Sequence, residues 1–151
     1  FNTLVPEFYA SEETLTVADI LLTPTKIYVK PVMAALQAGI DIKGMVHITC
    51  GGFYDNIPRV LPDGLGAEID KSQFPQELPI NALTEYICSA ALNIEERELY
   101  RVFNMGIGFI FIIDSKDYDK LSQTLSQTDE SLYKIGTVTQ GGDVKIKGID
   151  S

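Results

Sequence analysis

The 151-residue chain carries 21 acidic and 12 basic side chains, and its formal charge of −9 opposes a sequence-independent grip on nucleic acid or anionic lipid. Hydrophobic residues make up 45% of the chain, which is ordinary for a soluble globular protein with a core in one domain. The sequence shows neither an apolar run of membrane-spanning length nor a start of the signal-peptide type. Its two cysteines are too few for a disulfide framework and lack metal-type spacing, so a cytoplasmic location is expected.

The first part of the chain predicts an arm followed by a helix. Residues 1–20 show no sustained hydrophobic period, whereas residues 21–151 read as one domain. Pro31 suits the first turn of a helix, which is expected to end at Gly39. The apolar face of this helix is expected to consist of Val32, Ala35 and Leu36.

The middle of the chain alternates strand and helix signals. Residues 45–49 predict a buried strand and residues 65–70 a second one. Helices are expected from Asn81, from Asn93 in a capping-box-like start, and from Ser115. Between the last two, residues 107–113 are apolar at every position, which is typical of a strand covered on both faces.

The last strands are expected at residues 133–139 and 144–147, paired as a hairpin around Gly141-Gly142-Asp143. Long apolar strands between helices need cover on both faces, so this order predicts a mixed α/β (α+β) layer domain.

The segment from His47 to Pro62 carries the strongest chemical signal. An apolar run ends in Gly51 and Gly52, where backbone N–H groups can approach a ligand without a Cβ in the way. A helix after the glycines would add the positive end of its dipole, and Arg59 could hold anion oxygens. The segment is therefore interpreted as a phosphate cradle, although a glycine turn after a strand also occurs in proteins that bind nothing there.

Each candidate residue also has a purely structural interpretation. His47, the only histidine, could be a hydrogen-bonded structural residue, and Asn56 could cap or turn the backbone. Arg59 could pair with surface carboxylates such as Asp55 or Asp63. The two glycines after Asn104 could form a tight connection into a strand. No metal site is assigned within the chain.

Three stretches, in order, resemble one enzyme family. They are Leu21-Leu-Thr-Pro-Thr-Lys-Ile-Tyr-Val-Lys30, His47-Ile-Thr-Cys-Gly-Gly-Phe with Asn56-Ile-Pro-Arg59-Val-Leu-Pro62, and Glu98-Leu-Tyr-Arg-Val-Phe-Asn-Met-Gly-Ile-Gly108. Over residues 20–147 the chain resembles the C-terminal half of aminoimidazole ribonucleotide synthetases, also called phosphoribosylformylglycinamidine cyclo-ligases. The resemblance implies a three-layer α/β/α sandwich with a mixed sheet, partly ferredoxin-like. It also implies that residues 1–20 link to a missing N-terminal domain.

The resemblance implies ATP-dependent cyclisation of formylglycinamidine ribonucleotide to aminoimidazole ribonucleotide, in purine biosynthesis. The substrate supplies its own nucleophile, so no Ser-His-Asp set is required. Ligands for Mg²⁺ are expected mostly in the N-terminal domain, and the full-length enzyme is expected to be a homodimer. The piece alone is expected to be inactive. Alternatives are a sister enzyme (selenophosphate synthetase, thiamine monophosphate kinase or formylglycinamidine ribonucleotide synthetase) or a non-catalytic phosphate-binding module.

Carried over by position, the resemblance implies His47 as the catalytic donor or general acid/base. It further implies a substrate- and phosphate-binding set formed by the glycine loop, a second wall and a domain-facing edge. These residues are Thr49, Gly51, Gly52, Asn56, Arg59, Asn104, Gly106, Gly108, Thr25, Lys26 and Tyr28. Two positions depart from the family pattern: Cys50 replaces a third glycine, and Lys26 replaces an arginine and loses its bidentate fork. If Cys50 needs a positive φ, its Cβ costs about 1 kcal/mol.

Overall fold

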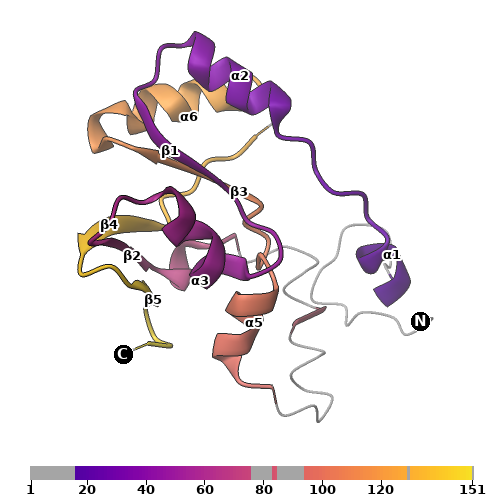
Figure 1. Ribbon diagram of the computed structural model, residues 1–151. Helices are drawn as coiled ribbons and strands as arrows, with labels where there is room; N and C mark the ends of the chain where they lie inside the picture. Colours follow the sequence, from indigo (N-terminus) through magenta and orange to yellow (C-terminus); the bar gives the residue numbers. More distant parts are fainter. Residues whose placement is uncertain (1–15, 76–82, 85–93, 129, 151) are drawn as a thin grey trace.

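The computed structural model describes residues 16–75, 83–84, 94–128 and 130–150 (Figure 1). The helices are α1 (Val17–Leu21), α2 (Val29–Gln37), α3 (Gly52–Asn56), α5 (Glu96–Val102) and α6 (Tyr118–Ser126). The strands are β1 (Ile42–His47), β2 (Leu65–Ile69), β3 (Phe109–Ile113), β4 (Gly136–Gln140) and β5 (Val144–Ile146). Short 3₁₀ turns lie at Ile57–Val60, Lys71–Gln73 and Ser115–Asp117.

The described strands form two small sheets. β1 and β3 pair antiparallel, with His47 opposite Phe109. The second sheet has the order β4-β2-β5, in which β2 runs antiparallel to β4 and parallel to β5. The α/β class with a mixed sheet is therefore confirmed.

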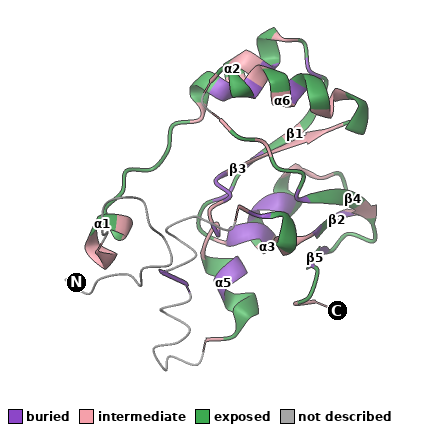
Figure 2. Cartoon of the chain, turned by 180° about the vertical axis from the view of Figure 1, so that it is seen from behind, coloured by how far each residue is buried: buried purple, intermediate pink, exposed green. Residues whose placement is uncertain are grey.

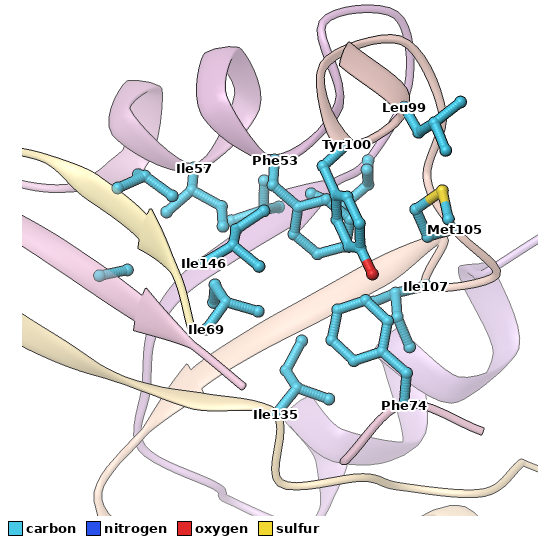
Figure 3. Close-up of a cluster of buried hydrophobic side chains, with 14 residues drawn as sticks. Phe53, Ile57, Ile69, Phe74, Leu99, Tyr100, Met105, Ile107, Ile135 and Ile146 are labelled. Atoms are coloured by element: carbon cyan, nitrogen blue, oxygen red, sulfur yellow. The ribbon is translucent and has the colours of Figure 1, made fainter. Parts of the chain in front are cut away.

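The β1–β3 pair lies between two hydrophobic clusters. Ile110 and Ile112 of β3 pack against the larger cluster, which α3, α5 and the second sheet share (Figure 3). Phe111 and Ile113 pack against the smaller cluster under α2 and α6, which lie side by side. Figure 2 shows those two helices at one end of the molecule and the partly buried α3 near its middle. The strand predicted within residues 107–113 is present, and alternate side chains face different clusters, but all five residues of β3 are only half-buried.

The predicted hairpin of the last two strands is wrong, because β2 lies between them. The connection at residues 141–143 crosses the end of β2. There the carbonyl oxygen of Asp143 accepts a hydrogen bond from the N–H of Ala67 at 3.0 Å. A Cβ on Gly66 would overlap that same carbonyl group. Gly66 thus makes room for the crossing, and a local turn signal cannot reveal this partner.

Other boundaries also differ from the predictions. The strand predicted at residues 45–49 ends at His47 and is not buried throughout, since Met45 and His47 are exposed on either side of buried Val46. The helix before Gly39 is present, with Gly39 at a φ of 67°, but Leu36 points away from its buried face.

Two predicted helix starts fall largely outside the described residues. Helix α5 begins at Glu96 after Glu95, which provides no side-chain cap, and Asn93 is outside the described residues. Most of the helix expected from Asn81 is outside them too. The helix expected from Ser115 is present as a 3₁₀ turn that leads into α6.

Asp150 joins the end of the chain to α3 and α5. Its carboxylate accepts hydrogen bonds from the Tyr54 hydroxyl at 2.6 Å, the Arg97 Nε at 2.8 Å and the Ile146 N–H at 2.8 Å. The Arg97 guanidinium also lies 4.6 Å from the centroid of the Tyr54 ring. Burial opposes ionisation of Asp150, but the three hydrogen bonds outweigh it and hold the pKa of Asp150 below its ordinary value of 3.8.

We expect Asp150→Asn to lower the free energy of unfolding at neutral pH by about 1–3 kcal/mol, because it removes a charge that accepts several hydrogen bonds. The folded-state pKa is depressed, so this stabilisation is present above the unfolded pKa and is lost as pH falls through the folded value. Urea unfolding at pH 7 and pH 3 measures both effects. The gap between wild type and variant should narrow at pH 3, whereas Asp119→Asn, on the exposed side of α6, should change little. An equal gap at both pH values would contradict the assignment.

Candidate functional site

Two loops that contain glycines meet at one end of the β1–β3 pair. Residues 48–52 follow β1, and residues 104–108 precede β3. Because His47 pairs with Phe109, both loops leave the same end of this antiparallel pair. The N–H of Ile48 donates to the carbonyl oxygen of Gly108 at 2.9 Å and fastens the loops together. The predicted glycine loop and the predicted second wall of the site therefore lie side by side.

The first loop presents free backbone donors. Gly51 and Gly52 have φ values of 94° and 52°, in the left-handed region that favours glycine. The N–H of Gly52 donates to the carbonyl oxygen of Thr49 at 3.0 Å. The N–H groups of Gly51, Phe53 and Tyr54 donate to no acceptor among the described residues. Free N–H groups at the start of α3 could donate hydrogen bonds to a bound anion.

Packing alone also requires the two glycines. A Cβ on Gly52 would overlap the carbonyl group of Tyr100 in α5. A Cβ on Gly51 would lie 2.7 Å from the Cβ of Asp55 and 2.8 Å from its Oδ2. The Asp55 carboxylate thus folds back over the loop, where its negative charge opposes a bound anion.

Asn56 fixes the shape of this loop. Its buried side-chain Nδ2 donates to the carbonyl oxygens of Cys50 at 3.1 Å and Gly52 at 2.8 Å, with a longer contact to Thr49 at 3.4 Å. Its Oδ1 accepts a hydrogen bond from Arg59 Nη1 at 3.2 Å. Asn56 therefore acts on the loop directly and orients Arg59.

The surroundings of Arg59 and the backbone conformation of Cys50 differ from what the sequence suggested. Arg59 is exposed and forms no ion pair with a described carboxylate, so the pairing considered with Asp55 or Asp63 is not present. Its remaining donors are available to another acceptor. Cys50 is exposed and its φ lies outside the left-handed region, so its Cβ causes no backbone strain there.

His47 lies on the exposed face of β1 beside two aromatic rings. Its ring centroid is 5.7 Å from that of Tyr28 in an edge-on arrangement and 6.2 Å from that of Phe109. No hydrogen bond to another described residue holds the imidazole, which differs from the structural interpretation of this residue. An exposed imidazole beside the loops can donate or accept a proton.

Tyr28 and Lys26 lie along a second feature, a cleft of about 830 Å³ that follows β3. Gly106 and Gly108 line this cleft as well, and residues 130–138 form its opposite wall. A Cβ on Gly108 would overlap the Tyr28 hydroxyl, so this glycine makes room for the tyrosine. Burial raises the pKa of the Tyr28 hydroxyl. Lys26 Nζ forms an ion pair with Glu130 Oε2 at 2.6 Å at the edge of the cleft.

The proposed site residues therefore fall into two neighbouring groups. His47, with the loop residues up to Arg59, lies at the end of the strand pair, and the cleft group lies along β3. Thr25 is exposed and does not line the cleft.

The sequence patterns gave no sign of one strained backbone position, at Met105. Met105 has a φ of 49° and is the one described non-glycine residue in the left-handed region, at a cost of about 1–2 kcal/mol. Its buried side chain packs into the larger cluster, and Asn104 Oδ1 accepts a hydrogen bond from the Gly106 N–H at 3.0 Å. Methionine carries no sequence signal for this conformation, so only the neighbouring asparagine and glycine could have suggested a tight turn.

In the part of the chain that the structure describes, no three His, Cys, Asp or Glu side chains gather closely enough to hold a metal ion. None of the helices described here has the length and apolar character needed to cross a membrane.

The fold and site define an α/β domain with paired glycine-containing loops at the end of an antiparallel strand pair. Residues 4–149 match the family described as "AIR synthase related protein, C-terminal domain", and the chain belongs to this family. The resemblance seen in the three sequence stretches is thereby confirmed.

Curated relatives agree with this assignment. The chain is 45% identical over 135 residues to phosphoribosylformylglycinamidine cyclo-ligase of Exiguobacterium sibiricum, a match that covers 89% of the chain and 38% of the relative. It is 45% identical over 131 residues to the same-named protein of Staphylococcus epidermidis, covering 87% and 36%. With that of Clostridium botulinum it shares 44% identity over 138 residues, covering 91% and 40%. The chain thus spans well under half the length of these relatives.

Proposed function

We propose that this chain is the C-terminal domain of an ATP-dependent cyclo-ligase that converts formylglycinamidine ribonucleotide to aminoimidazole ribonucleotide in purine biosynthesis. The observation that carries the proposal is the family match over residues 4–149. The compared relatives all bear the cyclo-ligase name, which favours this reaction over those of the sister enzymes.

In the proposed reaction, phosphoryl transfer from ATP to the formyl amide oxygen of the substrate gives ADP and turns that oxygen into a leaving group. A nitrogen of the substrate then attacks the same carbon, the ring closes, and the oxygen departs as phosphate. The protein must align two phosphorylated molecules and neutralise developing charge.

The residues of this chain supply binding and proton transfer. The free backbone N–H groups of Gly51 and Phe53 would hold a phosphate, and Arg59, oriented by Asn56, would pair with its oxygens. His47 would donate a proton to the reacting centre or accept one. Gly106 and Gly108, which line the cleft, would form the second wall together with Asn104, which accepts a hydrogen bond from Gly106.

The remaining machinery is proposed to lie in the preceding domain. Mg²⁺ would be bound mostly there, and Thr25, Lys26 and Tyr28 would form the edge that faces it. The full-length enzyme is proposed to be a cytoplasmic homodimer.

We expect the 151-residue chain alone to form no product from ATP and formylglycinamidine ribonucleotide, because in-line phosphoryl transfer needs metal ligands held in place. The full-length protein that carries this domain should form aminoimidazole ribonucleotide and ADP in equal amounts. Product chromatography with both preparations tests this directly. Cyclisation by the chain alone would contradict the proposal that the preceding domain supplies the metal ligands. No cyclisation by the full-length protein would contradict the proposed reaction.

A further inference from the structure

Helix α2 carries apolar side chains on two opposite faces. Pro31 and Ala35 are buried on its inner face, where Ala35 belongs to the smaller cluster together with Leu121 and Leu125 of α6. A second set, spaced at i, i+4 and i+7, forms one stripe on the opposite side of the helix. We name these residues, with the one that precedes the helix, the α2 outer stripe. Their exposed fractions are Ile27 78%, Val29 67%, Met33 46% and Leu36 47%.

Helix α6 provides an internal comparison, since it lies beside α2 and has the same length of nine residues. It buries Leu121 and Leu125, and its outward positions are polar or charged, as a solvent-facing helix requires. Its exposed residues include Asp119, Lys120, Gln123 and Ser126. A helix that is apolar on two opposite faces is normally covered on both, so α2 has the composition of a covered helix and α6 does not.

The exposed large hydrophobic side chains are concentrated in the part of the sequence that contains the stripe. Of the ten large hydrophobic residues exposed in the described part of the chain, seven lie between residues 21 and 45. Scattered single residues of this kind need no explanation, whereas a concentration on one helix marks a surface that contacts something else.

We propose that the α2 outer stripe is the surface on which the polypeptide that precedes this domain in the cyclo-ligase relatives docks. This inference rests on the domain order of the proposed function. The chain covers 36–40% of the length of three such relatives and matches a C-terminal domain, so the larger part of each relative precedes the matched region. Residues 23–28 connect α1 to α2 without forming a helix or strand, which places the stripe beside the entry of the chain into this domain (Figure 1).

A second copy of this chain fits the stripe less well. Each copy carries a net charge of −9, so pairing two copies brings like charges together. The preceding domain, by contrast, is covalently attached, which gives it a high effective concentration at a nearby surface.

Thiol accessibility tests the proposal. Met33→Cys is introduced in a Cys50→Ser, Cys88→Ser background, and maleimide labelling rates are compared in the 151-residue chain and in the full-length protein. Since labelling depends on exposure of the thiol, position 33 should label at least roughly tenfold more slowly in the full-length protein. Gln123→Cys on α6 is the matched control and should label equally in both. Leu36→Cys repeats the test if Met33→Cys does not fold.

Equal labelling at position 33 in both preparations would overturn the proposal. Protection that already exists in the 151-residue chain and grows with its concentration would also overturn it, in favour of a second copy. Turnover of the full-length protein without any of these substitutions separates this inference from the proposed reaction. Protection without cyclisation supports the docking surface and contradicts only the reaction.

Discussion

Replacing Gly52 with alanine is expected to lower the free energy of unfolding by about 3 kcal/mol or more. The new Cβ would overlap the carbonyl group of Tyr100, which is backbone and cannot swing aside. The residue would also have to keep a φ of 52°. The loop and α5 would have to separate, and the larger cluster would open. Urea unfolding at neutral pH measures the effect.

Gly64→Ala is the matched control. Gly64 also has a positive φ, of 82°, but no atom lies within 4 Å of a Cβ built there. It should therefore cost only about 1 kcal/mol, from backbone strain alone. Equal costs at the two glycines would show that close packing on α5 does not explain Gly52.

His47→Asn is expected to lower turnover of the full-length enzyme by roughly 10²-fold, because asparagine cannot act as a general acid or base. The imidazole is exposed and has no hydrogen bond to a described residue, so stability should stay within about 0.5 kcal/mol of wild type. Steady-state rates and urea unfolding of the same samples separate the two effects.

Lys43→Gln, at another exposed position of β1, serves as control and should leave turnover unchanged. Normal turnover per folded His47→Asn molecule would remove the catalytic role from His47. A loss of stability that accounts for the lost activity would do the same.

Local signals predicted the elements that local chemistry controls. Residues 107–113 predicted β3 because only a strand between two apolar surfaces tolerates apolar side chains at every position. Gly39 marked the end of α2 because its φ of 67° suits glycine. By contrast, the glycines at 141–142 suggested a hairpin, although the pairing depends on β2 and on the room at Gly66, far away in sequence.

The site shows the same division. The sequence indicated both glycine-containing loops, but their meeting depends on the pairing of His47 with Phe109, which no local pattern encodes. The sequence around Asp55 does not predict that its carboxylate lies over Gly51, and the sequence around Met105 does not predict its left-handed backbone. The role of Asn56 as the clamp of the loop follows only from its burial and its hydrogen bonds to backbone carbonyls.

Phosphate titration followed by NMR at the free amides of Gly51 and Phe53 tests the phosphate cradle most directly. We expect saturable shifts at these amides, weaker binding in Arg59→Gln, and binding roughly threefold or more tighter in Asp55→Asn, where a like charge is removed from the loop. No shift at either amide, in wild type and in Asp55→Asn alike, would mean that the two glycines serve only the packing of the loop against α5.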